Sequence, residues 1–284
     1  MKTLFLGGDL RQKYASDYMN SIGVPCKLYL NFSLDEELIN EIKSSNALVL
    51  PLPTSKDGIT VNATSNDKIL LGDLLKYIPL DSLILGGNIP NNFVSLANSF
   101  GYRIIDYYEN ESFQIYNALL SAEGAIFYSM EKISGTIYGS KIAILGFGRI
   151  GKILAYMLKS QGAKITIFAR KDLDRAWSNL IGYEAVKISD KFVAKSNDLK
   201  YDYDIIFNTI PNQIMNEEFA KELTDKTIII DLASYPFGIN PSLIEKYNLK
   251  YYRESGIPGR YAPQSAGNII GKTIINILEQ ENLL

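Results

Sequence analysis

The sequence predicts an α/β protein with two doubly wound parallel-sheet domains, the second of which is a Rossmann dinucleotide-binding domain. Short β-rich segments alternate with helical segments along the whole chain, which is typical of parallel sheets covered by helices on both faces. A glycine-rich turn, 146–151, follows an apolar strand and opens a helix. The length of 284 residues corresponds to about two domains of ordinary size.

The first 120 residues are expected to form a flavodoxin-like α/β domain that binds the substrate. Apolar runs predict strands at 3–6, 27–30, 47–50, 82–85 and 102–105. Apolar residues at helical spacing predict helices at 10–22, 35–45, 67–77 and 92–100. A longer helix over 115–133 then leads out of this domain, and the boundary is placed between residues 120 and 121.

Residues 121–284 are expected to form the Rossmann domain. Further strands are predicted at 141–145, 164–169, 204–209, 227–231 and 250–252. Glycine and proline bound the segment 256–263, which we expect to be a rigid loop before the last helix. That helix, expected at about 265–283, is a candidate for packing back on the first domain, an arrangement that two-domain dehydrogenases often show.

The composition excludes several classes of function. The chain contains no histidine, which rules out a Ser-His-Asp triad, histidine-ligated zinc and any dehydrogenase mechanism with a histidine acid or base. Proton chemistry must then rely on Asp, Glu, Lys, Tyr, Cys or water. A net charge of -2 argues against nucleic-acid binding, and the lack of long apolar runs argues against a membrane protein. With one cysteine and no secretion signal, a cytoplasmic protein without a metal site is expected.

The glycine-rich turn predicts dinucleotide binding. In this context Gly146 permits a tight turn, Gly148 lets the backbone approach a pyrophosphate, and Gly151 lets helix and strand pack closely. The alternative is a glycine-rich turn that binds no ligand. The residues assigned to the cofactor site here are Gly146, Phe147, Gly148, Arg149, Ile150 and Gly151.

The end of the next strand predicts which cofactor binds. NAD-dependent enzymes place an Asp or Glu there, which binds the ribose 2′-hydroxyl and repels a 2′-phosphate. This sequence instead has Ala169, Arg170 and Lys171, and the two cations favour NADP(H) over NAD(H). Two alternatives stay open. The cations are a solvated strand end, or the strand ends later and Asp172 is the ribose acceptor.

Two more turns are expected to flank the nicotinamide, because ligands lie beyond the carboxyl ends of parallel strands. The residues assigned to them are Thr209, Ile210, Pro211, Leu232, Ala233 and Ser234. Asp231 is a candidate catalytic carboxylate, although Asp231 and Ser234 are also suited to local hydrogen bonds in a turn. Pro258, in the 256–263 segment, is also assigned to the cofactor site.

Charged and polar side chains elsewhere are candidates for the substrate site. The substrate-binding candidates are Arg11, Thr54, Ser55, Lys56, Asn117 and Arg260. Arg11 and Lys56 follow two strands of the same sheet and can converge on an anion, or each is solvated. Arg260 is a carboxylate clamp or a surface arginine. Glu123 is a candidate proton acceptor, or a carboxylate stabilised by the helix dipole.

Taken together, these segments resemble the family of dipicolinate synthase A subunits. The matching pieces follow the family order and span nearly the whole chain. They include Gly7-Gly8-Asp9 with Arg11-Gln12, Tyr116-Asn117, Glu123-Gly124, Leu145 to Arg149, Ala169-Arg170, Asn208 to Pro211, Asp231 to Ser234 and Gly256 to Gly259. Only the nucleotide loop is specific by itself, and the ordered set is much more so.

The resemblance implies NADP-dependent oxidation of a dihydrodipicolinate-type dicarboxylate to dipicolinate during sporulation. It also implies that the partner is the flavoprotein-like B subunit of dipicolinate synthase, and that the location is the cytoplasm of the mother cell. Arg11 and Arg260 are then expected to clamp carboxylates, and Glu123 or a water to accept the proton. Two other functions stay open: another two-domain NADP-dependent dehydrogenase, similar to shikimate dehydrogenase, and a non-catalytic NADP-binding regulatory protein.

Overall fold

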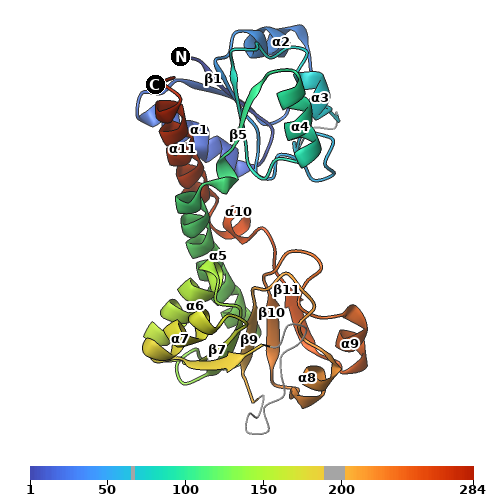
Figure 1. Ribbon diagram of the computed structural model, residues 1–284, viewed down its shortest axis with the longest axis vertical. Coiled ribbons are helices and arrows are strands. Elements are labelled where there is room, and N and C mark those ends of the chain that lie inside the picture. Colours follow the sequence, from blue (N-terminus) through green and yellow to red (C-terminus); the bar gives the residue numbers. More distant parts are fainter. Residues whose placement is uncertain (65–67, 189–201) are drawn as a thin grey trace. The chain divides into compact units, whose positions relative to one another are not determined.

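The computed structural model describes residues 1–64, 68–188 and 202–284, which form two compact units (Figure 1). The first unit consists of Met1–Asn117 and Pro258–Leu284, and the second of Ala118–Ile257. The expected domains were 1–120 and 121–284, so the chain is divided differently at both ends of the second unit. The larger difference concerns the C-terminal helix, which packs on the first unit, an arrangement that the sequence indicated as a candidate.

A five-stranded parallel sheet forms the centre of the first unit. Its strands are β1 (Thr3–Leu6), β2 (Cys26–Tyr29), β3 (Ala47–Val49), β4 (Leu83–Gly86) and β5 (Arg103–Asp106). They lie in the order β2-β1-β3-β4-β5, which is the flavodoxin-like order. Each strand lies within one residue of its predicted position.

Helices cover both faces of this sheet. They are α1 (Leu10–Ser21), α2 (Glu36–Lys43), α3 (Leu71–Leu74), α4 (Asn91–Ser99) and α11 (Pro263–Gln280). Alternate strand residues point to opposite faces, so Leu4 and Leu48 pack with α2, α3 and α4. Phe5 and Val49 pack on the other side with α1 and α11, which lie next to each other.

Two glycines allow α1 and α11 to pack closely. A Cβ on Gly267 would lie 2.6 Å from the backbone oxygen of Arg11, and one on Gly271 would lie 3.0 Å from that of Ala15. The apolar repeat that predicted the last helix supplies its buried face, with Ile274 at its centre. The C-terminal helix is therefore part of the core of the first unit.

The second unit contains a six-stranded parallel sheet. Its strands are β6 (Lys141–Leu145), β7 (Lys164–Ala169), β8 (Glu184–Lys187), β9 (Ile205–Asn208), β10 (Ile228–Asp231) and β11 (Lys250–Arg253). Their order, β11-β10-β9-β6-β7-β8, is that of the Rossmann fold. The predicted fold class, two doubly wound parallel-sheet domains with a Rossmann domain second, is confirmed.

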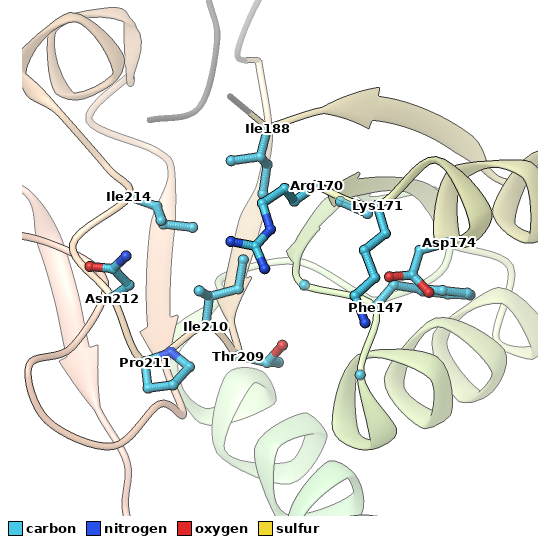
Figure 2. Close-up of a pocket in the computed structure, with 13 residues that line it drawn as sticks. Phe147, Arg170, Lys171, Asp174, Ile188, Thr209, Ile210, Pro211, Asn212 and Ile214 are labelled. Carbon is cyan, nitrogen blue, oxygen red and sulfur yellow. The ribbon is translucent and has the colours of Figure 1, made fainter. Parts of the chain in front are cut away.

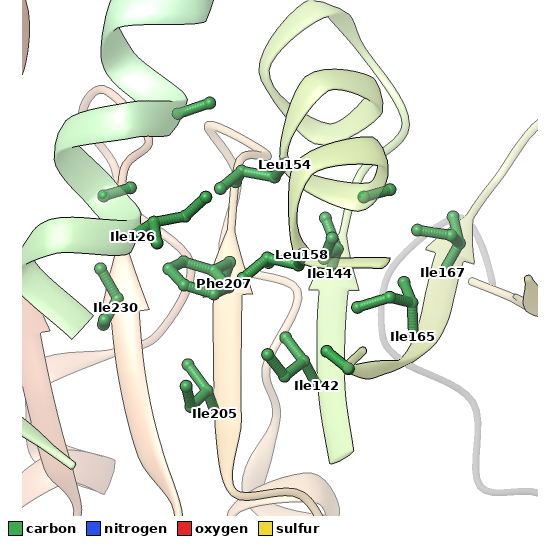
Figure 3. Packing of buried hydrophobic residues seen from close by; sticks show 14 of the residues in the cluster. Ile126, Ile142, Ile144, Leu154, Leu158, Ile165, Ile167, Ile205, Phe207 and Ile230 are labelled. Carbon is green, nitrogen blue, oxygen red and sulfur yellow. The ribbon is translucent and has the colours of Figure 1, made fainter. Parts of the chain in front are cut away.

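The helices of the second unit again cover both sheet faces. They are α5 (Glu111–Lys132), whose first residues belong to the first unit, α6 (Arg149–Ser160), α7 (Asp172–Leu180), α8 (Glu217–Glu222) and α9 (Pro241–Lys246). Figure 3 shows Ile126 of α5 and Leu154 of α6 packed over Ile144 and Phe207 of the sheet. This packing holds α6 against the strands whose ends form the site.

Three local predictions differ from the structure. The strand β8 and the helix α7 were not predicted, because β8 is a half-buried edge strand without a clear apolar alternation. The segment 256–263, expected to be a loop, contains the short helix α10 (Ile257–Tyr261). The helix predicted at 67–77 begins outside the described residues, and the described part forms only α3. Within the described ranges, no helix is long and apolar enough to cross a membrane.

Candidate functional site

A cavity of about 570 Å³ lies at the carboxyl ends of β6, β7 and β9 (Figure 2). Three predicted cofactor segments meet in its wall: 146–148, 169–171 and 209–211. Its remaining lining residues are Asp174, Ile188, Asn212 and Ile214. The cavity therefore lies where a Rossmann fold binds its nucleotide, at the ends of the central strands.

The three glycines of the turn are constrained in different ways. A Cβ on Gly151 would lie 2.2 Å from the backbone oxygen of Gly146, and one on Gly146 would lie 2.4 Å from Oγ1 of Thr209. Gly146 also has a φ of 103°, which other residues rarely adopt. A Cβ on Gly148 would have no atom within 4 Å. The outer glycines are thus required by packing, whereas Gly148 leaves open space where a ligand can approach the backbone.

The N-terminus of α6 is suited to an anion. Gly148 is the N-cap residue and has no side chain to accept hydrogen bonds from the first-turn amides. The first turn also contains no acidic residue. Backbone amides at a helix start and the positive end of the helix dipole favour a phosphate, so the turn fits the pyrophosphate of a dinucleotide.

Two cations and one carboxylate line the other side of the cavity. In Figure 2, Arg170 extends its guanidinium into the middle of the cavity, while Lys171 and Asp174 lie beside Phe147. The strand β7 ends at Ala169, as predicted, so the alternative of a later strand end does not apply. Apolar side chains complete the wall and offer a surface for a planar base; they are Ile188, Ile210 and Ile214.

Asp231 holds neighbouring loops together. Its side chain is fully buried, and its oxygens accept hydrogen bonds from Nδ2 of Asn208 (2.8 Å), from the amides of Ala233 (3.0 Å) and Gly238 (2.7 Å), and from the Tyr251 hydroxyl (2.8 Å). Burial, together with the bond to Asp231, raises the pKa of Tyr251 and keeps it a donor. Four donors on one carboxylate favour the local hydrogen-bonding role of Asp231 over proton transfer.

The other predicted residues of the second unit do not line the cavity. They are Arg149, Ile150, Gly151, Leu232, Ala233 and Ser234. Leu232 extends the hydrogen bonding between β9 and β10, since its amide donates to the backbone oxygen of Asn208 (2.9 Å). Ser234 is exposed, and Glu123 is exposed on α5. The proton-accepting role of Glu123 stays a prediction.

In the first unit, Arg11 forms contacts within the chain. Its Nη2 donates to Oδ2 of Asp9 (2.8 Å) and to the backbone oxygen of Leu52 (2.5 Å), and its side chain is 14% exposed. A Cβ on Gly259 would lie 3.0 Å from its Nε, so α10 packs against the guanidinium. Burial raises the pKa of Asp9, but Arg11 and, more weakly, Lys56 outweigh it and leave that pKa below its usual value. The anion paired with Arg11 is therefore Asp9, whereas exposed Lys56 acts on this carboxylate only through its charge.

The hydroxyl groups predicted to bind substrate are also used within the chain. Thr54 is fully buried and donates to the backbone oxygens of Pro51 (3.1 Å) and Gly87 (3.2 Å). Ser55 donates to Oδ1 of Asp57 (2.9 Å). These contacts favour a structural role for both hydroxyls, in the loop that follows β3.

The remaining candidates lie at different depths. Lys56 and Arg260 are exposed, and Asn117 is half-buried in α5. The Arg260 guanidinium lies 5.4 Å from the ring of Tyr261. Pro258 is buried in α10 and belongs to the first unit. The assignments of these residues to substrate or cofactor stay predictions.

Sequence reasoning missed part of the cavity wall. Asp174 comes from α7, and Ile188 directly follows β8; neither element was predicted from the sequence. Asn212 and Ile214 follow the predicted turn at 209–211, and extending that turn would have included them. Burial raises the pKa of the Cys26 thiol to about 12, which disfavours the thiolate form that a nucleophile needs.

The fold is that of two-domain dehydrogenases, and the matching dehydrogenase domain supports an oxidoreductase with a nicotinamide dinucleotide cofactor. Residues 112–234 match the family described as the NAD binding domain of D-isomer specific 2-hydroxyacid dehydrogenases. D-lactate dehydrogenase from Escherichia coli has the same fold, with a TM-score of 0.65 at 14% identity over 99% of this chain and 97% of that one.

The chain is similar to dipicolinate synthase A subunits over nearly its full length, as the sequence resemblance predicted. Residues 2–108 match the family described as the N-terminal domain of the dipicolinate synthase A subunit. The A subunit of Bacillus subtilis is 28% identical over 99% of this chain and 96% of its own length. The crystal structure of the A subunit from Bacillus halodurans superposes with a TM-score of 0.85 at 26% identity, covering 98% of this chain and 97% of that one.

Proposed function

We propose that this chain acts as the A subunit of a dipicolinate synthase and oxidises a dihydrodipicolinate-type dicarboxylate to dipicolinate with NADP+. The observation that supports this most is the similarity to dipicolinate synthase A subunits over both units and nearly the full length of each chain. Similarity confined to the Rossmann domain would support only a dehydrogenase. Residues 2–108 of the first unit match this family as well.

The cavity supports NADP+ as the cofactor. The matching dehydrogenase family is described as NAD-binding, but NAD-binding domains place a carboxylate at the strand end where this chain has Arg170 and Lys171. A 2′-phosphate carries up to two negative charges and is stabilised by such cations. Asp174 opposes them in part, so the cavity wall favours the phosphate by one net charge.

The proposed chemistry suits a chain without histidine. The cofactor accepts a hydride from the substrate carbon, and formation of an aromatic ring supplies the driving force. The chain then has to orient the substrate, neutralise two carboxylates and accept one proton. Arg260 remains a proposed carboxylate ligand, and exposed Lys56 replaces Arg11 as the second one. The guanidinium of Arg11 is paired with Asp9 and packed against α10. Glu123 or a water is the proposed proton acceptor.

The proposal includes a partner and a place in the cell. By analogy with the family, we expect a flavoprotein-like B subunit to complete the enzyme, in the cytoplasm of the mother cell of an endospore former. The test is dipicolinate formation, followed by ultraviolet absorbance. The aldol product of the lysine pathway is supplied with NADP+ or NAD+ to this chain alone and to its mixture with a candidate B subunit.

Product with NADP+ supports the reaction and the cofactor, and the arm that lacks the B subunit shows whether the partner is needed. A matched pair of variants controls for charge: Arg170→Ala should weaken NADP+ use, whereas Lys226→Ala, at the opposite edge of the same sheet, should not. No product in any mixture, with NADPH still bound, would favour a non-catalytic nucleotide-binding role for the chain.

A further inference from the structure

Arg175 cross-links the turn that joins β7 to α7. Its Nη1 donates to the backbone oxygens of Ala169 (3.2 Å) and Arg170 (2.6 Å), and its Nη2 donates to Oδ1 of Asp172 (2.8 Å). The arginine side chain is 17% exposed, whereas the side chain of Asp172 is 95% exposed. One guanidinium thus binds three acceptors within four consecutive residues, and its rigid fork geometry fixes their relative positions.

The turn between β7 and α7 carries Arg170 and Lys171, the two cations that line the cofactor cavity. Arg170 and Lys171 line the cavity, whereas Arg175 contacts the backbone and Asp172 from the side. Without Arg175, the two backbone oxygens at the end of β7 would lose this donor and the turn could rotate. The direction in which Arg170 and Lys171 point therefore depends on a residue outside the cavity wall.

Arg175 also acts on the carboxylate that would favour the other cofactor. In NAD-dependent enzymes an acidic residue after the second strand of the domain accepts hydrogen bonds from the ribose 2′-hydroxyl. Asp172 is the first acidic residue after β7, and its carboxylate is paired with Arg175. The pair neutralises the acid that would repel a 2′-phosphate and occupies one oxygen that would bind a ribose hydroxyl.

We propose that Arg175 is a positioning residue that sets the preference of this protein for a dinucleotide with a 2′-phosphate. It does so by fixing the turn that carries Arg170 and Lys171 and by pairing with Asp172. The inference rests on the proposed function, because it requires that the second unit binds NADP(H). It adds to that function a residue that determines cofactor selectivity without touching the cofactor.

The test measures dissociation constants of NADPH and NADH for the full chain by nicotinamide fluorescence, without substrate or partner. Arg175→Met keeps the length of the side chain and removes its donors. We expect it to reduce the ratio of NADPH to NADH affinity by about tenfold or more, since each lost charged hydrogen bond corresponds to about that factor. Arg175→Lys, which retains the charge, should restore part of the ratio.

Two further variants separate the two effects. Asp172→Asn leaves the bonds from Arg175 to the backbone intact, and we expect it to keep the preference for NADPH. The exposed ion pair contributes little to stability, so this variant should unfold like the wild type. In Arg175→Met the carboxylate of Asp172 loses its partner and becomes available to the ribose hydroxyl of NADH, so NADH affinity should rise. The double variant Arg175→Met with Asp172→Asn lacks this carboxylate, so it should lose NADPH affinity without gaining NADH affinity.

The outcomes are distinguishable. If Arg175→Met and Arg175→Lys weaken both cofactors equally, or lower only the melting temperature, Arg175 is merely structural and the inference is overturned. A wild type that prefers NADH overturns the inference together with the NADP assignment, but leaves the oxidoreductase proposal standing. A wild type that binds neither cofactor overturns the proposed function as well. If Arg175→Met does not fold, Arg175→Lys is the deciding variant. An unchanged ratio of NADPH to NADH affinity in Arg175→Lys would contradict the role of the guanidinium geometry.

Discussion

The contrast between Gly148 and Gly151 gives the sharpest prediction about the cofactor turn. A Cβ on Gly148 would meet no atom within 4 Å, and its φ of -81° is accessible to alanine. Gly148→Ala should therefore fold normally, with a change in unfolding free energy below about 1 kcal/mol. The added methyl group fills the space through which a phosphate approaches the first amides of α6. Loss of one charged hydrogen bond there should weaken NADPH binding by roughly 10- to 100-fold.

Gly151→Ala is the matched variant with the opposite expectation. Its Cβ would lie 2.2 Å from the backbone oxygen of Gly146, so α6 has to move away from β6. Overpacking of this kind costs about 3 kcal/mol, which corresponds to a loss of roughly 6 to 12 °C in melting temperature. Circular dichroism melts and NADPH fluorescence titrations of both variants test the pair. Wild-type NADPH affinity in Gly148→Ala would refute the pyrophosphate assignment.

Three further predictions concern supporting contacts. Gly267→Ala brings a Cβ to 2.6 Å from the backbone oxygen of Arg11 and should lower the free energy of unfolding in urea by about 2 kcal/mol; an unchanged midpoint would contradict the packing of α1 and α11. Asp231→Asn weakens the hydrogen bond from the Gly238 amide (2.7 Å) and should also lower the free energy of unfolding by about 2 kcal/mol. A variant that loses turnover but keeps full stability would instead support a catalytic role for Asp231. Burial raises the pKa of Asp9, but Arg11 lowers it further, so its ionised form stabilises the fold above the unfolded pKa of 3.8. That contribution disappears as the pH falls through the lower folded pKa, and Asp9→Asn should flatten the acid side of the pH–stability curve; an unaltered curve would contradict the pairing.

Much of the fold was predictable because its strands are short, buried and apolar. Runs such as Lys141–Leu145 and Ile228–Asp231 are bounded by turn residues and separated by helices of ordinary length, and this pattern is read directly from the sequence. The edge strand β8 was not predictable, since its end residues Glu184 and Lys187 are exposed and its middle is half-buried. The packing of the last helix on the first domain was named as a candidate from the sequence, but the limits of 1–120 and 121–284 still counted that helix with the second domain.

The cofactor cavity was more predictable than the substrate site. Glycine spacing and strand ends locate phosphate and ribose contacts by local geometry, which is encoded within a few residues. The partners of Arg11 and Thr54 include backbone oxygens from other loops, those of Leu52 and Gly87. Every residue has a backbone oxygen, so no sequence pattern predicts which of them accepts a hydrogen bond from a given side chain. For this reason Arg11 and Thr54 were predicted to bind a ligand, although their hydrogen-bond partners lie within the chain.

The most direct test of the proposed function follows the oxidised product and the reduced cofactor in one cuvette. The chain, together with a candidate B subunit, is mixed with the aldol product of the lysine pathway and NADP+, and dipicolinate and NADPH are recorded at their separate absorbance bands. Dipicolinate and NADPH should appear together in equal amounts, and the Arg170→Ala variant should slow the formation of both equally. Dipicolinate formed without NADPH would show that another oxidant does the chemistry, and would contradict the assignment of the reaction to this chain.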